Sequence, residues 1–114
     1  MTRGEIWWAD YGMPTGSEAG FRRPVLIMQD DAFNRSRIGT VIVVPLTTNL
    51  ALAEAPGNVP LGRKESGLPR DSIIVVSQVG AIDKRRLVES AARLRKGTIA
   101  KVESGLRLVL GLKS

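Results

Sequence analysis

The alternation of apolar and polar positions predicts strands in the first third of the chain. Residues 4–11 are rich in β-preferring side chains. Alternation places the large side chains of this segment on two faces, Ile6 with Trp8 and Trp7 with Ala9. Residues 24–29 form a nearly continuous apolar run, typical of a strand buried on both faces. The intervening residues 12–22 contain three glycines and a proline, which favours a long irregular loop.

A third strand is expected at residues 40–47, which are β-branched and apolar. Pro45 has no N–H to donate to a neighbouring strand, so it predicts a sheet edge or a bulge near the end of this segment. Residues 30–39 are polar and turn-forming, and residues 48–71 are the least structured part of the pattern. Shorter candidate strands are residues 58–61, 72–76 and 79–82, with a helical turn at residues 83–88. Residues 90–94 fit either a further strand or a loop.

The C-terminal part predicts an amphipathic helix. Apolar residues recur there at steps of three or four, namely Ile99, Val102, Leu106, Val109 and Leu110. Thr98 is the expected N-cap, and Gly105 inside the helix costs about 1 kcal/mol relative to Ala. Five or six short strands with one terminal helix predict a mainly β (α+β) fold, built as a small curved sheet or partly open barrel.

Length and composition bound the possible functions. A chain of 114 residues fits one domain, residues 1–114. The absence of Cys and His excludes disulfides, thiolate and Ser-His nucleophiles, and most transition-metal sites. No apolar run approaches the ~18 residues of a membrane span, and no signal peptide is visible. We expect a cytoplasmic protein that has no metal or cofactor and no membrane association.

Positive charge gathers in the second half of the sequence. Residues 1–57 carry five basic and six acidic side chains, net −1, and residues 58–114 carry twelve and five, net +7. The densest basic runs are Lys84-Arg85-Arg86 and the group Arg93, Arg95 and Lys96. Nucleic acid or an acidic protein would suit this field, and so would a solvated basic face that serves solubility.

Two arginines stand where the loop at 12–22 enters the buried strand. Pro24 restricts Arg23 to extended conformations, so this guanidinium is held where it could bind a phosphate with two donors. The alternative is a structural ion pair of Arg22 or Arg23 with Glu5 or Glu18. The sequence leaves both open.

Hydroxyl and amide side chains follow the third expected strand at Thr47, Thr48 and Asn49. Threonine is common in strands, so an ordinary structural role is the simpler interpretation. Trp7, Trp8 and Tyr11 could stack on bases. Alternation puts the two tryptophans on opposite faces, which favours core or dimer packing for at least one of them.

A spaced set of motifs covers residues 3 to about 112 and resembles the MazF/PemK family of toxin endoribonucleases. The segments that carry this resemblance are Arg3-Gly4-Glu5-Ile6-Trp7, Asp10, Gly16-Ser17-Glu18, Arg23-Pro24-Val25, Asn34, Pro45-Leu46-Thr47-Thr48, Asp71-Ser72, Gln78-Val79 and Ile82-Asp83-Lys84-Arg85-Arg86-Leu87. The resemblance implies an SH3-like barrel, a symmetric homodimer, metal-independent cleavage of single-stranded RNA, and inhibition by a cognate antitoxin with an acidic tail.

The resemblance also implies roles for individual residues. Arg23 and Thr47 correspond to the catalytic pair. The positions that contact RNA correspond to Arg3, Ser17, Glu18, Asn49 and Gln78. The chain departs from the family pattern at Phe21, where glycine is common, and at Ser77, where some relatives have an acidic residue, so the cleavage sequence does not transfer.

RNA supplies its own nucleophile, because the 2′-hydroxyl can attack the adjacent phosphate and leave a 2′,3′-cyclic phosphate and a 5′-hydroxyl. A guanidinium stabilises the charge that grows on the phosphoryl oxygens but is a poor general base. Glu18 is the carboxylate near Arg23 in the sequence that could accept the 2′-hydroxyl proton, and we therefore hypothesise that it is the base.

Two other functions fit parts of the pattern. Toxins that poison DNA gyrase share the expected barrel and dimer but act by binding protein. A non-catalytic RNA-binding module would also use the net charge of +6. The Arg23-Pro24 step together with Thr47 favours the nuclease.

Overall fold

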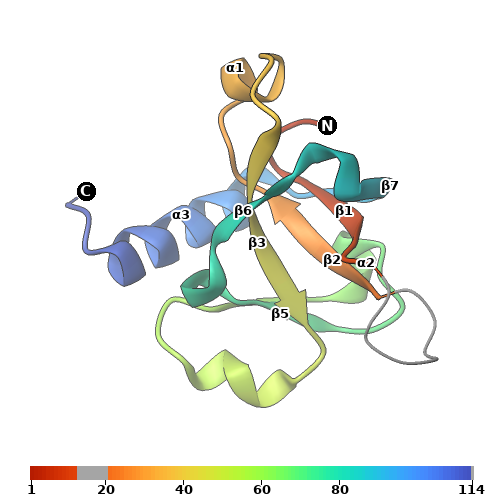
Figure 1. The fold of residues 1–114 in the computed structure, drawn as a ribbon. Helices are drawn as coiled ribbons and strands as arrows, with labels where there is room; N and C mark the ends of the chain where they lie inside the picture. The colour runs from red at the N-terminus through yellow and green to blue at the C-terminus, as the bar shows by residue number, and fades with distance from the viewer. Residues whose placement is uncertain (13–20, 114) are drawn as a thin grey trace.

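The computed structural model describes residues 1–12 and 21–113, and within them seven antiparallel strands form one curled sheet (Figure 1). The strands are β1 (Glu5–Asp10), β2 (Arg22–Ile27), β3 (Thr40–Thr47), β4 (Val59–Leu61), β5 (Ser72–Ile74), β6 (Gly80–Asp83) and β7 (Leu87–Arg93). Their order is β4-β5-β3-β2-β1-β7, and β6 also pairs with β3. This confirms the expected mainly β fold with a curved sheet and a C-terminal helix.

Short helices connect the strands. These are α1 (Asp31–Asn34), the 3₁₀ turns η1 (Leu50–Glu54), η2 (Val76–Gln78) and η3 (Lys84–Arg86), and α2 (Arg63–Ser66). One of them, η3, lies within the helical turn expected at residues 83–88. The long helix is α3 (Lys96–Leu110), which projects to one side of the sheet in Figure 1. Among the described residues, no helix has both the length and the apolar character needed to cross a membrane.

The alternation predicted for the first strand separates two apolar clusters. Ile6 is fully buried in a cluster that Trp8 and residues of α3 also pack against. Ala9 is buried in a second cluster on the other face, and Trp7 packs there. The sheet is therefore covered on both faces, which explains why β2 reads as a continuous apolar run.

The prediction that Pro45 marks a sheet edge is wrong, because β3 is an interior strand. Residues 40–43 of β3 pair with β6, whereas Leu46 and Thr47 pair with β5. Pro45 lies between these two blocks, and its carbonyl accepts a hydrogen bond from Val75 N at 3.0 Å. The missing N–H thus falls where β3 changes its partner, which explains how proline fits inside the sheet.

The prediction that Thr98 is the N-cap of α3 is wrong, because Arg95 is the N-cap and the first helical residue is Lys96. The carboxylate of Glu65 in α2 binds the first residues of α3. It accepts hydrogen bonds from Arg95 N at 3.0 Å and from the Thr98 hydroxyl at 2.7 Å. Burial by itself raises the pKa of Glu65, and these hydrogen bonds outweigh burial and hold the pKa below its usual value.

Gly105 owes its place inside α3 to a close backbone contact. A Cβ built at Gly105 would lie 2.2 Å from the carbonyl oxygen of Gly57. Any other residue would push the helix away from the loop before β4. The packing of α3 on the sheet therefore offsets the low helix propensity of glycine.

Candidate active site at the ends of strands β2 and β3

The sheet register brings Arg23 and Thr47 together. Val25 of β2 pairs with Pro45 of β3, and Leu26 pairs with Val44. Continuing this antiparallel register by two residues places Arg23 opposite Thr47, on the same face of the sheet. The two residues that the resemblance singled out are 24 positions apart in the sequence, and they meet at the start of one strand and the end of the other.

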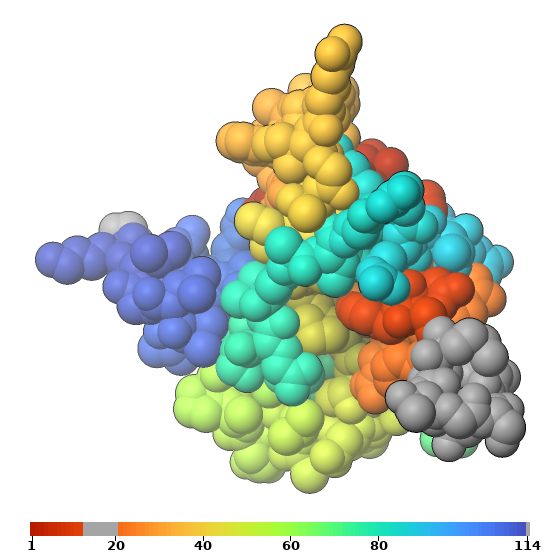
Figure 2. Space-filling view, viewed as in Figure 1, coloured from red at the N-terminus to blue at the C-terminus, as the bar shows by residue number. Residues whose placement is uncertain are grey.

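Two adjoining hollows open on this pair. One has a volume of about 370 Å³ and the other about 420 Å³. Both are lined by Phe21, Arg23, Leu46 and Thr47. Figure 2 shows a depression with β3 at its floor, between the end of β1 and the start of β2 on one side and the β6 region on the other. A ligand lying across both hollows would pass directly over Arg23 and Thr47.

The hydroxyl of Thr47 is oriented by the residues that follow it. Its Oγ1 accepts a hydrogen bond from Asn49 N at 3.2 Å, so the hydroxyl proton is available to another acceptor. The side-chain oxygen of Asn49 accepts a hydrogen bond from Ala51 N at 3.2 Å and thereby caps η1. The Thr47 hydroxyl can therefore donate a hydrogen bond to a ligand in the hollow. Asn49 is exposed, and its side-chain NH₂ group is a further donor.

Arg23 is held by an aromatic ring. Its guanidinium carbon lies 4.6 Å from the centroid of the Phe21 ring. Among the described residues, no hydrogen bond or ion pair occupies the Arg23 guanidinium. The ion pair expected as an alternative for Arg23 with Glu5 is absent from that set. Glu5 instead accepts from Thr2 N and from the Trp7 indole.

Other polar groups surround the pair. Arg22 and Arg70 line the first hollow together with Ser72, and Gln78 lines the second. Arg22 lies 3.9 Å from Glu89 in an exposed ion pair, which is too loose to neutralise it. Arg70 carried no signal in the sequence pattern, because it enters the site from an irregular segment whose path depends on the fold.

Tyr11 borders the second hollow, whereas the sequence pointed to it only as a stacking residue. Burial raises the pKa of its hydroxyl, and the charges of Arg23 and Arg86 act in the opposite direction. The net effect is an increase, so Tyr11 is protonated at neutral pH and offers a donor. It cannot serve as the missing base there.

Arg3 lines neither hollow, and two of its guanidinium nitrogens are engaged elsewhere in the fold. Its Nε donates to the Met28 carbonyl at 3.0 Å, and its Nη2 pairs with Glu103 of α3 at 2.7 Å. The structure therefore does not bring Arg3 into the two hollows. Ser17 and Glu18, the remaining expected site residues, lie outside the described residues.

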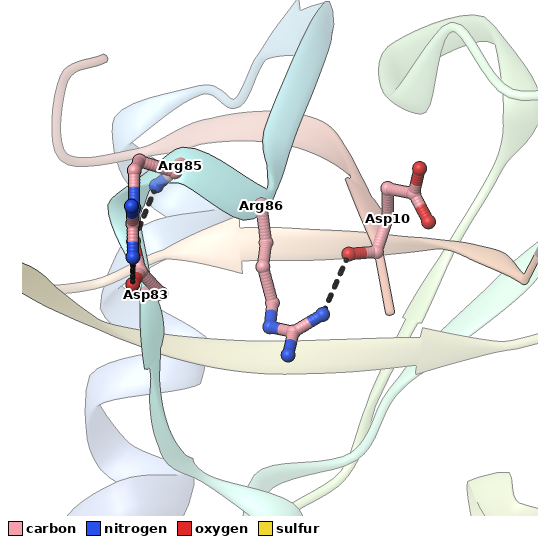
Figure 3. Close-up of polar contacts among 4 residues, drawn as sticks. All are labelled: Asp10, Asp83, Arg85 and Arg86. Atoms are coloured by element: carbon pink, nitrogen blue, oxygen red, sulfur yellow. Dashed lines mark hydrogen bonds and ion pairs between the residues drawn. The ribbon is translucent and has the colours of Figure 1, made fainter. Parts of the chain in front are cut away.

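The basic run at residues 84–86 is largely engaged in the fold. Lys84 Nζ donates to three backbone carbonyls at the end of α1, those of Phe33, Asn34 and Ser36. Arg85 folds back onto Asp83 at 2.9 Å, and Arg86 reaches the carbonyl of Asp10 at 3.2 Å (Figure 3). The hydrogen bonds of Lys84 and Arg86 to neutral carbonyls hold these side chains in place but leave their positive charges, and only the charge of Arg85 is offset by a carboxylate.

No cluster of three or more carboxylates that could hold a metal ion occurs within residues 1–12 and 21–113. The groups at the site are instead cations, hydroxyls and amides, which are donors suited to a phosphate. An anionic substrate with phosphodiester groups fits this chemistry better than a divalent cation does.

Comparisons with known proteins define the class. The sequence model of the family of PemK-like, MazF-like toxins of type II toxin–antitoxin systems matches residues 2–110 of this chain. The chain is therefore a toxin of the PemK/MazF family.

Named relatives extend this result over nearly the whole chain. Endoribonuclease MazF6 of Mycobacterium tuberculosis is 43% identical over 112 residues, which cover 98% of both chains. Endoribonuclease EndoA of Bacillus subtilis is 37% identical and covers 98% of this chain and 96% of its own. Since these relatives are named as nucleases, the alternative of a gyrase-binding toxin is not favoured.

Solved structures agree with the fold. A MazE–MazF crystal structure from Deinococcus radiodurans superimposes with a TM-score of 0.81 and 24% identity, covering 99% of this chain and 97% of that one. An endoribonuclease from a Mycobacterial species, solved in complex with its cognate antitoxin, gives a TM-score of 0.77 at 24% identity, covering 100% of this chain and 96% of that chain. The curled sheet with its C-terminal helix is thus the MazF toxin fold.

Proposed function

We propose that this chain is the toxin of a type II toxin–antitoxin system and acts in the cytoplasm as an endoribonuclease on single-stranded RNA. One observation carries the proposal: Arg23 and Thr47 both line each of two adjoining open hollows. A phosphodiester of an extended RNA strand would lie over this pair, with one neighbouring nucleotide in each hollow. The endoribonuclease names of the relatives support the same activity.

The reaction forms one bond and breaks one. The ribose 2′-oxygen attacks phosphorus and loses its proton, while the bond from phosphorus to the 5′-oxygen breaks and that oxygen gains a proton. The products are a 2′,3′-cyclic phosphate and a 5′-hydroxyl. Arg23 stabilises the negative charge on the phosphoryl oxygens with two N–H donors, and Thr47 donates a third hydrogen bond.

The two proton transfers need further groups. A guanidinium stays protonated in proteins, so Arg23 can neither take the 2′-hydroxyl proton nor give up one of its own. It can hydrogen-bond to the leaving oxygen, and water supplies the proton that this oxygen gains. Glu18, three residues before Phe21 in the sequence, is our hypothesis for the base. The choice rests on chemistry, because a carboxylate is ionised at neutral pH and can accept a proton.

Binding uses the groups around the pair. Arg22 and Arg70 at the first hollow suit the phosphate next to the scissile one. Exposed amides suit base edges, since an amide offers both a donor and an acceptor, and these are Asn49 and Gln78. Ser17 is a further contact implied by the family resemblance.

The partners follow from the same site. We propose a homodimer and a cognate antitoxin of the MazE kind, whose acidic segment would compete with RNA for the arginines at the hollows. One structural neighbour is an endoribonuclease solved with its cognate antitoxin, and another is a complex of MazE with MazF. Positively charged hollows would attract both polyanions, and salt would weaken both interactions.

The test is incubation of the purified protein with a long single-stranded RNA in the presence of EDTA, followed by chemical mapping of the new termini. We expect cuts at a few short sequences that leave 2′,3′-cyclic phosphate and 5′-hydroxyl ends. Salt-sensitive binding without new ends would favour the non-catalytic module instead. Loss of every cut on chelation would refute the mechanism.

A further inference from the structure

Phe21 is the strongest feature of the site that the proposed mechanism leaves without a role. Its ring is 39% exposed, yet it packs against two side chains. Arg23 lies over the ring at 4.6 Å, and Tyr11 meets it edge to face with a centroid distance of 6.2 Å and an interplanar angle of 61°. The three side chains lie in contact with one another and border the second hollow.

Backbone hydrogen bonds fix the positions of Tyr11 and Phe21 relative to each other. Tyr11 N donates to the Phe21 carbonyl at 2.8 Å, and Phe21 N donates to the Gly12 carbonyl at 2.9 Å. Two residues after β1 therefore face one residue before β2, as in a β-bulge. Gly12 has a φ of +91°, which favours glycine and allows this arrangement.

A stacked ring orients a guanidinium without consuming its donors. The guanidinium carbon lies over the face of the ring at 4.6 Å, a contact in which the ring offers no carboxylate or carbonyl acceptor, and the five N–H groups of arginine point outward in the guanidinium plane. A carboxylate in place of the ring would accept those N–H groups and neutralise the charge, as Glu103 does for Arg3. Phe21 therefore leaves the donors of Arg23 available for a phosphate.

We propose that Phe21 is a positioning residue for cleavage, whose ring holds the Arg23 guanidinium with its donor edge toward the scissile phosphate. This inference rests on the proposed nuclease function. Phe21 is also one of the two positions at which the chain departs from the family pattern that the sequence resembles. The ring is thus a particular feature of this chain rather than an expected part of the site.

The experiment compares variants that keep or remove the aromatic face. F21L and F21M remove the ring but stay apolar, F21W keeps an aromatic face, and F33L removes an exposed ring of α1 away from the site. We expect F21L and F21M to lower kcat about fivefold to tenfold with KM changed by less than about twofold, since an ordering contact with the cation is lost. F21W and F33L should stay within about twofold of the unmodified chain.

A spectroscopic measurement tests the contact without RNA. The Arg23 Nε–H resonance, assigned by its loss in R23K, should be shifted by the ring current in the unmodified chain and in F21W. The shift should vanish in F21L and F21M, while thermal unfolding shows that these variants fold.

Each outcome decides a separate point. Unchanged kcat in F21L and F21M would overturn the proposal, and so would equal losses in F21L and F21W with an unchanged Arg23 resonance. If the unmodified chain cuts no RNA, the proposed function fails, whereas the resonance still decides whether Phe21 holds Arg23.

Discussion

Two arginines to which the family resemblance gives roles at the RNA site, one in contact with RNA and one catalytic, have opposite surroundings in the structure. Arg3 gives its Nε to the Met28 carbonyl and its Nη2 to Glu103, joining the start of β1 to α3. Arg23 rests on the face of Phe21, at the edge of two open hollows. The Arg3 guanidinium links two elements of the fold, whereas the Arg23 guanidinium lies where a ligand in the hollows would contact it.

The difference shows how to separate structural from functional charges in a basic protein. The net charge of +6 does not identify the cations that meet a ligand. Lys84 is bound to backbone carbonyls and Arg95 pairs with Glu65 at 3.0 Å, and in this they resemble Arg3. Arg22, Arg23 and Arg70 gather at one hollow. We therefore expect mutations of the arginines at the hollow to lower cleavage more than stability. Mutations of the cations that bind other parts of the fold should lower stability more than cleavage.

The largest effect on cleavage is expected for R23A. Removing a preorganised group that stabilises the transition-state charge costs about 10²–10³ in rate. The thermal unfolding temperature should hardly change, because the side chain is exposed. Single-turnover cleavage of a short RNA measures the rate, and R35A, which removes another exposed charge, is the matched control. Near-normal cleavage by R23A would remove Arg23 from the site.

The next effect is expected for E18Q. Loss of a general base lowers the rate by about 10² or more. The acidic limb of the pH–rate profile should also disappear, since an amide cannot be deprotonated in that range. An unchanged rate and an unchanged acidic limb would exclude Glu18 from the chemistry.

T47V tests the second member of the pair. The variant keeps the β-branched shape but removes the hydroxyl, and a hydrogen bond to a charged group contributes about 1.5–3 kcal/mol. We expect a loss of about tenfold to a hundredfold in kcat, with recovery in T47S. Equal activity of T47V and T47S would show that the hydroxyl is not used.

R3A should show the reverse pattern. The side chains of Arg3 and Glu103 are 31% and 37% exposed, so screening limits their interaction. We expect the free energy of unfolding to fall by about 1 kcal/mol or less, with cleavage within about twofold of the unmodified chain. A double-mutant cycle with E103A isolates the coupling in urea unfolding. A large loss of cleavage with unchanged stability would return Arg3 to the RNA-binding surface.

The smallest effect concerns acid stability. Hydrogen bonds from Arg85 lower the pKa of Asp83 from 3.8 to about 2. The stabilisation is complete above pH 3.8 and declines as the pH falls toward 2, because the unfolded chain takes up the proton first. D83N should therefore show a smaller drop in unfolding temperature over this interval than the unmodified chain. E54Q, at an exposed carboxylate of η1, should retain the full drop.

The strand positions of Arg23 and Thr47 were predictable from local sequence, whereas their pairing as a candidate site came from the family resemblance. Pro24 marked Arg23 as an extended residue at a strand start, and Thr47 ended a clear β-branched run. Both positions follow from local conformational preferences. The partner exchange of β3 at Pro45 was not predictable, since it depends on β5 and β6, which lie more than 25 residues away in the sequence.

The sequence by itself determined the strands, the terminal helix and the two apolar faces of β1, because these depend on side chains a few residues apart. The tertiary structure decided which charges stay available. Arg3 met Glu103 across 100 residues, Thr98 met Glu65 across 33, and Arg23 came to lie over the ring of Phe21. Such pairings depend on how distant segments of the chain meet, and the spacing of residues along one segment does not contain that information.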